Sequence, residues 1–322
     1  MISKVKTRLQ TVPTPMAGLA LGIASLGWCW ENYANLHGYG QWFGAGIASV
    51  LLFVLTFKFL LHPKLLQDDL AHPVVGSVVP TFAMAVMVVS NTIGQFYPLA
   101  GDAIWVSAVI LHAIFLLSFV YHRIDDLQLH HMVPSWFVPP VGIIVAGVSY
   151  SGNPALSLVA DGALAFGMTA YAVMLPIMIY RFMFSQQVPD SAKPTLAVLA
   201  APASLSMAGY LTVASEPSPL LLSLLFGIAV LMTLIIYLSF FKLLRLPFSP
   251  GYAAFTFPVV IGSTALFKLA SWMEGVGMST QYIHQIEWLA SLELLIATVV
   301  VLYVSVRYLN HYKGSWLPIL KP

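Results

Sequence analysis

Residues 249–273 read SPGYAAFTFPVVIGSTALFKLASWM, an apolar stretch with Pro258 close to its middle. A helix of about 20 residues, at roughly 1.5 Å each, crosses the hydrocarbon core of a bilayer, so this stretch can span a membrane. A proline inside a helix frees a carbonyl group, which a membrane tolerates only where protein or a water-filled cavity satisfies it. This helix is therefore expected to face something other than lipid.

The residues around this proline combine bulk with small size. Phe255 and Phe257 precede it, and the small residues 262–265, beginning with Gly262, follow it. An aromatic ring in a narrow apolar pore blocks passage sterically and by dewetting, which makes Phe257 a candidate gate. The chain has 19 phenylalanines, so a packing role for Phe257 stays open as the alternative.

The composition of the 322 residues points to a membrane protein. Hydrophobic residues make up 59%, charged residues 8%, and the mean hydropathy is +0.86. A soluble protein could not coat so much apolar surface, so the prediction is an all-α, polytopic membrane protein that forms one integral domain over residues 1–322. No nucleophile motif, metal-ligand spacing, phosphate-binding loop or basic surface is present. We therefore expect no enzyme activity, no cofactor, no metal and no nucleic-acid partner.

Apolar segments of the right length predict ten transmembrane helices, of which the fifth is short. They cover residues 15–30, 42–61, 74–93, 103–121, 137–150, 156–179, 196–214, 220–244, 252–273 and 283–309.

Basic residues test this count, because lysine and arginine favour cytoplasmic loops. Of the 14 in the chain, all except Lys268 fall in the two tails or in alternate connections. The other connections carry acidic residues, such as Glu31, Glu216 and Glu274. An even number of spans with both termini in the cytoplasm follows, as expected for a multi-pass protein of an inner or plasma membrane.

Prolines recur in the odd-numbered spans at intervals of roughly 60 residues, which indicates a repeated unit. The first span has Gly18 and Gly22 instead. We interpret the pattern as a helical hairpin repeated five times, with broken odd helices that differ in role from the straight even ones. The alternative is that proline is simply commoner in membrane helices than in soluble ones. The prolines concerned are Pro80, Pro139 with Pro140, Pro202 and Pro258.

Charge within the spans is scarce, and each instance is a functional candidate because its burial is costly. Lys268 and Glu287 lie at similar depths in the ninth and tenth spans and are a candidate ion pair. Alternatively, Lys268 extends to the outer interface, or attracts anions to an outer vestibule. The odd spans are otherwise nearly uncharged, so helix ends would supply partial positive charge without a permanent cationic site, and such a conduit would pass weakly bound anions.

Segments of all five odd spans together resemble the tellurite-resistance/dicarboxylate transporter family, which includes bacterial tellurite-resistance proteins and plant slow anion channels. The matching segments are PTPMAGLALGIASLGWCW (13–30), HPVVGSVVP (72–80), PSWFVPPVG (134–142), KPTLAVLAAPASLSMAGYL (193–211) and YAAFTFPVVIGSTALFK (252–268).

This resemblance implies ten helices in five hairpins with quasi-fivefold symmetry, odd helices lining a central pore, and a homotrimer with one pore per subunit. It also implies that Phe257 is the gate, with Phe255 as the competitor if the register differs by two residues. The expected function is an anion channel for small anions such as chloride or nitrate. The alternative is a proton-coupled secondary transporter that exports sulfite, a C4-dicarboxylate such as malate, or tellurite-related anions.

Overall fold

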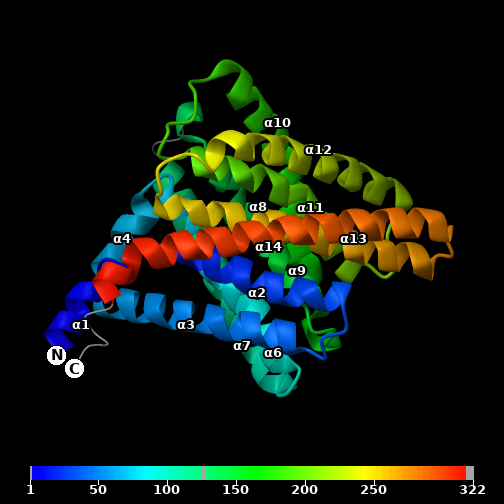
Figure 1. Cartoon of the computed structure of the whole chain (residues 1–322), viewed down its shortest axis with the longest axis horizontal. Coiled ribbons are helices and arrows are strands. Elements are labelled where there is room, and N and C mark those ends of the chain that lie inside the picture. Colours follow the sequence, from blue (N-terminus) through cyan, green and yellow to red (C-terminus); the bar gives the residue numbers. More distant parts are fainter. Residues whose placement is uncertain (1, 125–127, 317–322) are drawn as a thin grey trace.

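A computed structural model describes residues 2–124 and 128–316 and contains α-helices and short 3-10 turns packed side by side (Figure 1). Within the described residues, eight helical segments are long and apolar enough to cross a membrane, which confirms the prediction of an all-helical, multi-pass protein. They cover Tyr39–Leu61, Val75–Gly94, Pro98–Ile124, Pro154–Phe184, Lys193–Val213, Pro219–Leu243, Pro250–Gly275 and Thr280–Lys313.

The first and fifth predicted spans are the ones outside this set. The first forms α2 (Met16–Tyr33), whose end carries the polar residues Glu31 and Asn32 and lowers its apolarity. The fifth forms a shorter apolar segment, Pro134–Val148, broken into 3-10 and α turns. The count of ten spans therefore stays a prediction.

The helices are connected as consecutive antiparallel pairs. The first pair is α2 with α3 (Tyr39–Leu61), and the second is α6 (Thr81–Gly94) with α7 (Pro98–Ile124). In the third pair the first member has three parts, α8 (Val138–Val141), η3 (Gly142–Ile144) and α9 (Val145–Val148), and the second member is α10 (Ser157–Phe184). The last two pairs are α11 (Ala201–Val213) with α12 (Pro219–Leu243) and α13 (Thr256–Gly275) with α14 (Thr280–Trp316). Short helices α1 (Ile2–Leu9), α4 (Pro63–Ala71) and α5 (Val75–Val78) and the remaining 3-10 turns complete the described chain.

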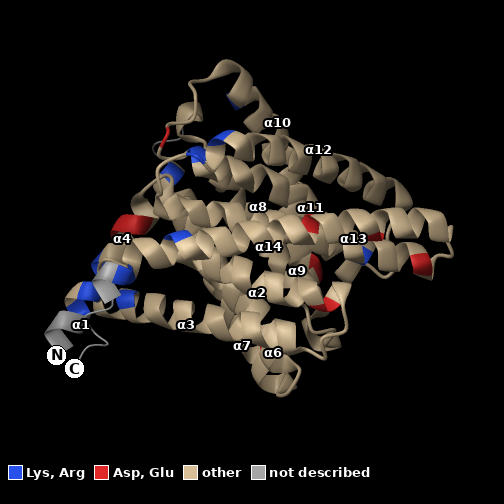
Figure 2. Ribbon diagram, viewed as in Figure 1, with Lys and Arg blue, Asp and Glu red and all other residues tan. Residues whose placement is uncertain are grey.

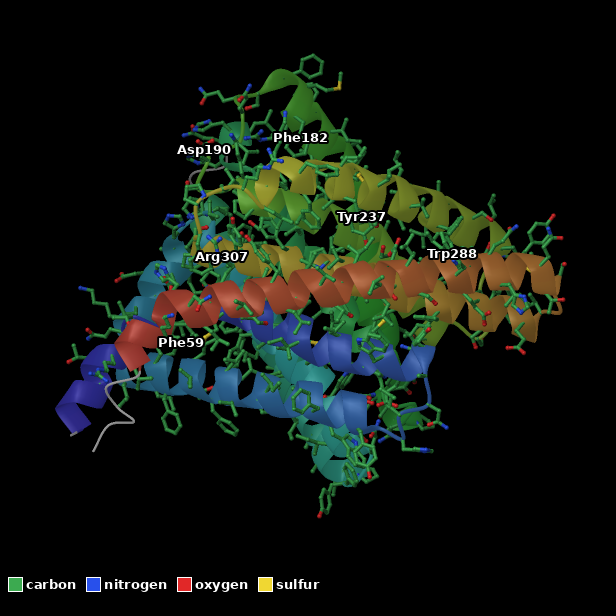
Figure 3. The ribbon with its side chains drawn as sticks, viewed as in Figure 1. Phe59, Phe182, Asp190, Tyr237, Trp288 and Arg307 are labelled. Carbon is green, nitrogen blue, oxygen red and sulfur yellow. The ribbon has the colours of Figure 1, made fainter. Side chains whose placement is uncertain are left out.

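The first members of these pairs pack against one another as a closed ring, in which α2 contacts α6, α6 contacts α9, α9 contacts α11, α11 contacts α13, and α13 returns to α2. We call this set the inner ring. In one apolar stretch of 18 residues in each of its longer segments, 67–78% of the residues are buried, whereas the corresponding stretches of the second members have 28–39% buried. Large apolar side chains of the outer helices, such as Phe182 and Trp288 (Figure 3), are exposed. Exposed apolar side chains on the outer helices are what a lipid-facing layer requires.

Each helix of the inner ring, counting α8 as the start of the fifth span, begins at a proline. Pro258 is the third residue of α13, which follows the separate 3-10 turn η6 (Pro250–Phe255). The expected long helix with a proline in its middle is therefore corrected to two segments, because an amide in the first helical turn has no intrahelical acceptor and its loss costs nothing. The equivalent prolines are Pro15, Pro80, Pro139 and Pro202.

Basic residues gather at one end of the bundle, near both described ends of the chain (Figure 2). The last turns of α3, α7, α10 and α12 carry Lys58, Arg123, Arg181 and Lys242 there. We call this the basic end. It is the end that the charge distribution of the sequence predicts to be cytoplasmic.

Candidate functional site

A cavity of about 510 Å³ extends from the basic end into the middle of the bundle. Its entrance is lined by residues 10–15, which precede α2, and by the start of η6 at Ser249–Gly251. Deeper in, every span of the inner ring contributes to the wall. The deepest lining residues of the spans, among those described, are Leu21, Met84, Gly142, Leu205 and Pro258.

Phe257 lies next to Pro258 in the wall of this cavity. Its side chain is 7% exposed and lines the cavity. Phe255 is fully buried elsewhere, with its ring centroid 5.6 Å from that of Phe240 and 4.9 Å from that of Tyr252. The two phenylalanines therefore occupy different environments, and Phe257 is the one whose ring can obstruct the cavity.

The start of α13, and with it Phe257, is held against α2. The Thr256 hydroxyl lies 2.7 Å from the Ala253 carbonyl oxygen and 3.1 Å from that of Gly18. Gly22 makes this approach possible, because a Cβ atom there would lie 2.5 Å from Thr256 Cβ and 3.2 Å from the Phe257 amide nitrogen. Gly22 thus acts in the α2–α13 contact, and it is not among the residues that line the cavity.

Side chains satisfy two of the carbonyl groups near the proline starts. The Thr81 hydroxyl donates to the Val78 carbonyl at 2.6 Å, and Nε2 of the buried His112 lies 2.8 Å from the Pro139 carbonyl oxygen. An unpaired carbonyl in hydrocarbon costs several kcal/mol, so these bonds stabilise the breaks between segments.

The other predicted pore residues are divided. Gly18, Pro202 and Pro258 line the cavity, whereas Pro80, Pro139 and Pro140 start helices without being among its described lining residues. Gly262 faces α14 instead of the axis, because a Cβ atom there would collide with Oε2 of Glu293.

The candidate outer pair is not formed. Among the described residues no ion pair joins Lys268 to Glu287: the Glu287 side chain is exposed and Lys268 is half-buried. Glu287 lies at the edge of the stripe that α14 buries, which runs through Ile283, Ala290 and Leu294.

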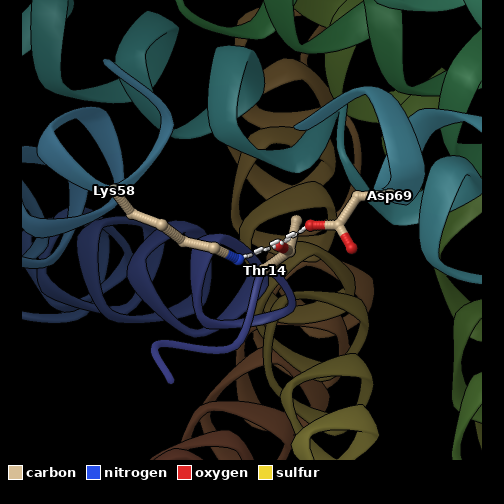
Figure 4. Close-up of polar contacts among 3 residues, drawn as sticks. All are labelled: Thr14, Lys58 and Asp69. Carbon is tan, nitrogen blue, oxygen red and sulfur yellow. Dashed lines mark hydrogen bonds and ion pairs between the residues drawn. The ribbon is translucent and has the colours of Figure 1, made fainter. Parts of the chain in front are cut away.

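Sequence reasoning missed a charged cluster in the cavity wall (Figure 4). Nζ of Lys58 donates to Oγ1 of Thr14 at 2.8 Å and lies 3.5 Å from Oδ2 of Asp69, to which the Thr14 hydroxyl also donates. All three residues line the cavity. The expectation of a conduit without a cationic site is therefore wrong at this end. The available signal was a lysine placed within an apolar span, in the last turn of α3.

The sequence of the chain is similar to those of known transport proteins. The profile of the voltage-dependent anion channel family matches residues 12–309. Two uncharacterized transporters of Methanocaldococcus jannaschii are each 25% identical, over 76% and 68% of this chain and 80% and 72% of their own lengths. The tellurite resistance protein TehA homolog of Haemophilus influenzae is 22% identical over 76% of each chain. These similarities confirm the resemblance drawn from the odd-numbered spans, and the chain belongs to the voltage-dependent anion channel family.

Proposed function

We propose that this protein is a channel for small anions such as chloride or nitrate, with Phe257 as its gate. The observation that carries the proposal is the cavity that the whole inner ring encloses and that Phe257 lines. An apolar ring across a narrow passage excludes water and therefore ions. Displacement of that ring would connect the cavity with the other end of the bundle.

The helix starts around the cavity favour anions. The inner helices begin beside its wall, at Pro15, Thr81, Val138, Pro202 and Phe257. The dipole of a helix places about half a positive charge at its start, which attracts anions. The dipole acts even where the first amides, such as those of Met16, Ala17 and Gly18 in α2, already donate to the preceding turn. Repeated around one axis, these helix starts make the cavity electropositive without binding an anion so tightly that it cannot leave.

Replacement of Phe257 by alanine tests the gate. Phe257→Ala should increase chloride and nitrate flux from liposomes well above the wild-type rate, because it removes the ring from the cavity wall. The control is Phe43→Ala on α3, where the ring is 74% exposed on the outside of the bundle and its loss should not alter flux. Equal flux from Phe257→Ala, Phe43→Ala and wild-type protein at matched incorporation would contradict the proposal.

A second candidate function is a proton-coupled secondary transporter that exports sulfite, a C4-dicarboxylate such as malate, or tellurite-related anions. The observation that favours it is the carboxylate of Asp69 in the cavity wall, because a titratable group beside the path can couple proton and anion movement. A carrier would give saturable uptake driven by a pH gradient. A channel would give flux that follows the electrochemical gradient of the anion alone.

The proposal extends to assembly and location. The closed contacts of the inner ring support quasi-fivefold symmetry within a single integral-membrane domain, and we propose a homotrimer with one pore per subunit in an inner or plasma membrane. Native mass spectrometry of the protein in detergent tests the stoichiometry, and a monomer or dimer as the main species would contradict this part.

A further inference from the structure

Each outer helix carries a lysine or arginine near the basic end. Among the described residues of this set, only Lys58 lines the cavity. The others make contacts outside it. Arg123 donates to the Ala71 carbonyl at 2.5 Å, Arg181 lies 3.4 Å from the His130 carbonyl oxygen, and Arg307 lies over aromatic rings. Lys242 is exposed. Lys58 is therefore the member of this set that a permeating ion would meet.

The Lys58 ammonium is incompletely paired. Only 4% of this residue is exposed, and an ammonium carries three N–H donors. One donor goes to Thr14 Oγ1 at 2.8 Å. The carboxylate of Asp69 lies 3.5 Å away, beyond the roughly 2.7–2.9 Å of a strong ammonium–carboxylate hydrogen bond. The charge is therefore balanced, while donor capacity remains at the cavity wall.

The partner carboxylate is partly exposed. Asp69 belongs to α4, a short helix in which no residue is buried, and its side chain is 26% exposed. The helix itself is held in place, because Leu66 and Leu70 pack against the cluster of Val79, Ala83 and Phe115. The partly exposed Asp69 carboxylate therefore leaves the ammonium by rotation of its own side chain, without movement of α4. By contrast, removing Asp69 without a replacement would leave a buried cation unpaired, which is unfavourable.

We propose that Lys58 is an anion-binding residue of the cavity, and that Asp69 is a built-in anion which a halide or small oxyanion displaces from the ammonium. The role in permeation rests on the proposed function, whereas the binding itself does not. In the empty cavity Asp69 neutralises Lys58. An entering anion takes over the Lys58 donor and is released when the Asp69 carboxylate returns.

The variants Asp69→Asn and Lys58→Met test this exchange. Asn keeps the shape of Asp69 but cannot compete as an anion, so the dissociation constant for chloride should fall roughly tenfold, the effect of about one charge-assisted hydrogen bond. Met keeps the length of Lys58 without its charge and should raise the dissociation constant at least as much. The matched control is Asp190→Asn, which breaks the exposed ion pair with Lys193 that lies outside the cavity lining.

Binding is measured on the full-length protein in detergent, from the shift of its unfolding temperature with chloride, replacing gluconate at constant ionic strength. Anions that bind the folded state stabilise it by RT ln(1 + c/Kd), where c is the anion concentration, so the dependence of this temperature on chloride concentration gives the dissociation constant. Opposite shifts in affinity for Asp69→Asn and Lys58→Met, with Asp190→Asn unchanged, support the proposal. Equal affinities, or a change of the same sign in both variants, would overturn it and make the cluster a structural clamp.

Flux in liposomes then separates this inference from the proposed function. Opposite affinity shifts without anion flux in either wild-type protein or Phe257→Ala would leave the anion site intact and refute the channel. Flux that responds to Phe257→Ala, with the same chloride affinity in every Lys58 and Asp69 variant, would retain the channel and refute the anion site.

Discussion

The contact between α2 and the start of α13 makes a sharp prediction about Gly22. In Gly22→Ala the new Cβ atom would lie 2.5 Å from Thr256 Cβ, whereas ordinary contacts begin at 3.4 Å, a shortfall of 3.4 − 2.5 = 0.9 Å. The obstacle includes the Phe257 amide nitrogen at 3.2 Å, so rotation of the Thr256 side chain alone cannot relieve the overlap. The helices must separate, and overpacking of this kind costs about 1–3 kcal/mol.

Gly18 supplies the matched control one turn earlier on the same helix. A Cβ atom there would lie 3.5 Å from Ala253 Cβ, which is ordinary van der Waals contact. Gly18→Ala should therefore be neutral or slightly stabilising, because alanine favours the helix over glycine by up to about 1 kcal/mol. The two variants make the same chemical change in the same helix and differ only in the space available.

Thermal unfolding in detergent, followed by the fluorescence of the 8 tryptophans, measures the difference. Each kcal/mol shifts the midpoint of a domain of 150–250 residues by roughly 2–4 °C, so Gly22→Ala should unfold several degrees below Gly18→Ala. A midpoint for Gly22→Ala equal to or above that of Gly18→Ala would refute the close approach of α2 to α13, and with it our account of what positions Phe257.

Two further contacts give predictions for unfolding experiments of the same kind. In Gly262→Ala the new methyl group meets the Glu293 carboxylate, so stability should fall by about 1–2 kcal/mol, whereas Gly227→Ala, with open space, should not be destabilised; equal midpoints would exclude the packing of Glu293 over α13. Trp105→Phe removes a buried indole donor to a carbonyl oxygen at 3.1 Å and a hydroxyl at 3.2 Å, a loss of about 1–3 kcal/mol, while the exposed Trp288→Phe should change stability little. Similar losses in both tryptophan variants would argue against those bonds.

Much of the architecture was accessible from the sequence, because a membrane demands long apolar segments and basic residues mark their ends. The prolines were harder to interpret. A proline indicates that a helix is interrupted, but not whether the proline lies inside one bent helix or at the start of a second. In the structure Pro258 lies in the first turn of α13. The first span was described by its glycines, although it also starts at a proline: Pro15 precedes α2 just as Pro80 precedes α6.

The site could be predicted only where a local pattern determines it. Phe255 and Phe257 are two residues apart, so on a helix they point in nearly opposite directions, but the passage from η6 to α13 decides which one meets the cavity. Lys58 contacts Thr14, which lies 44 residues earlier in the chain, and Asp69 on the following helix, and no periodicity encodes either contact. Its position near the end of an apolar span indicated only which side of the membrane it favours.

The same contacts constrain how the passage could open. The start of α13 is fixed by the Thr256 hydroxyl and by the absence of a side chain at Gly22, so moving the backbone of Phe257 would break the bonds to Ala253 and Gly18. The ring itself borders a cavity of about 510 Å³, far more than a phenyl group needs. Rotation of the side chain within this space would move the ring out of the passage without separating α2 from α13. A gate of this kind keeps the inner ring intact, because the moving part is one aromatic ring and the helices that carry it stay in place.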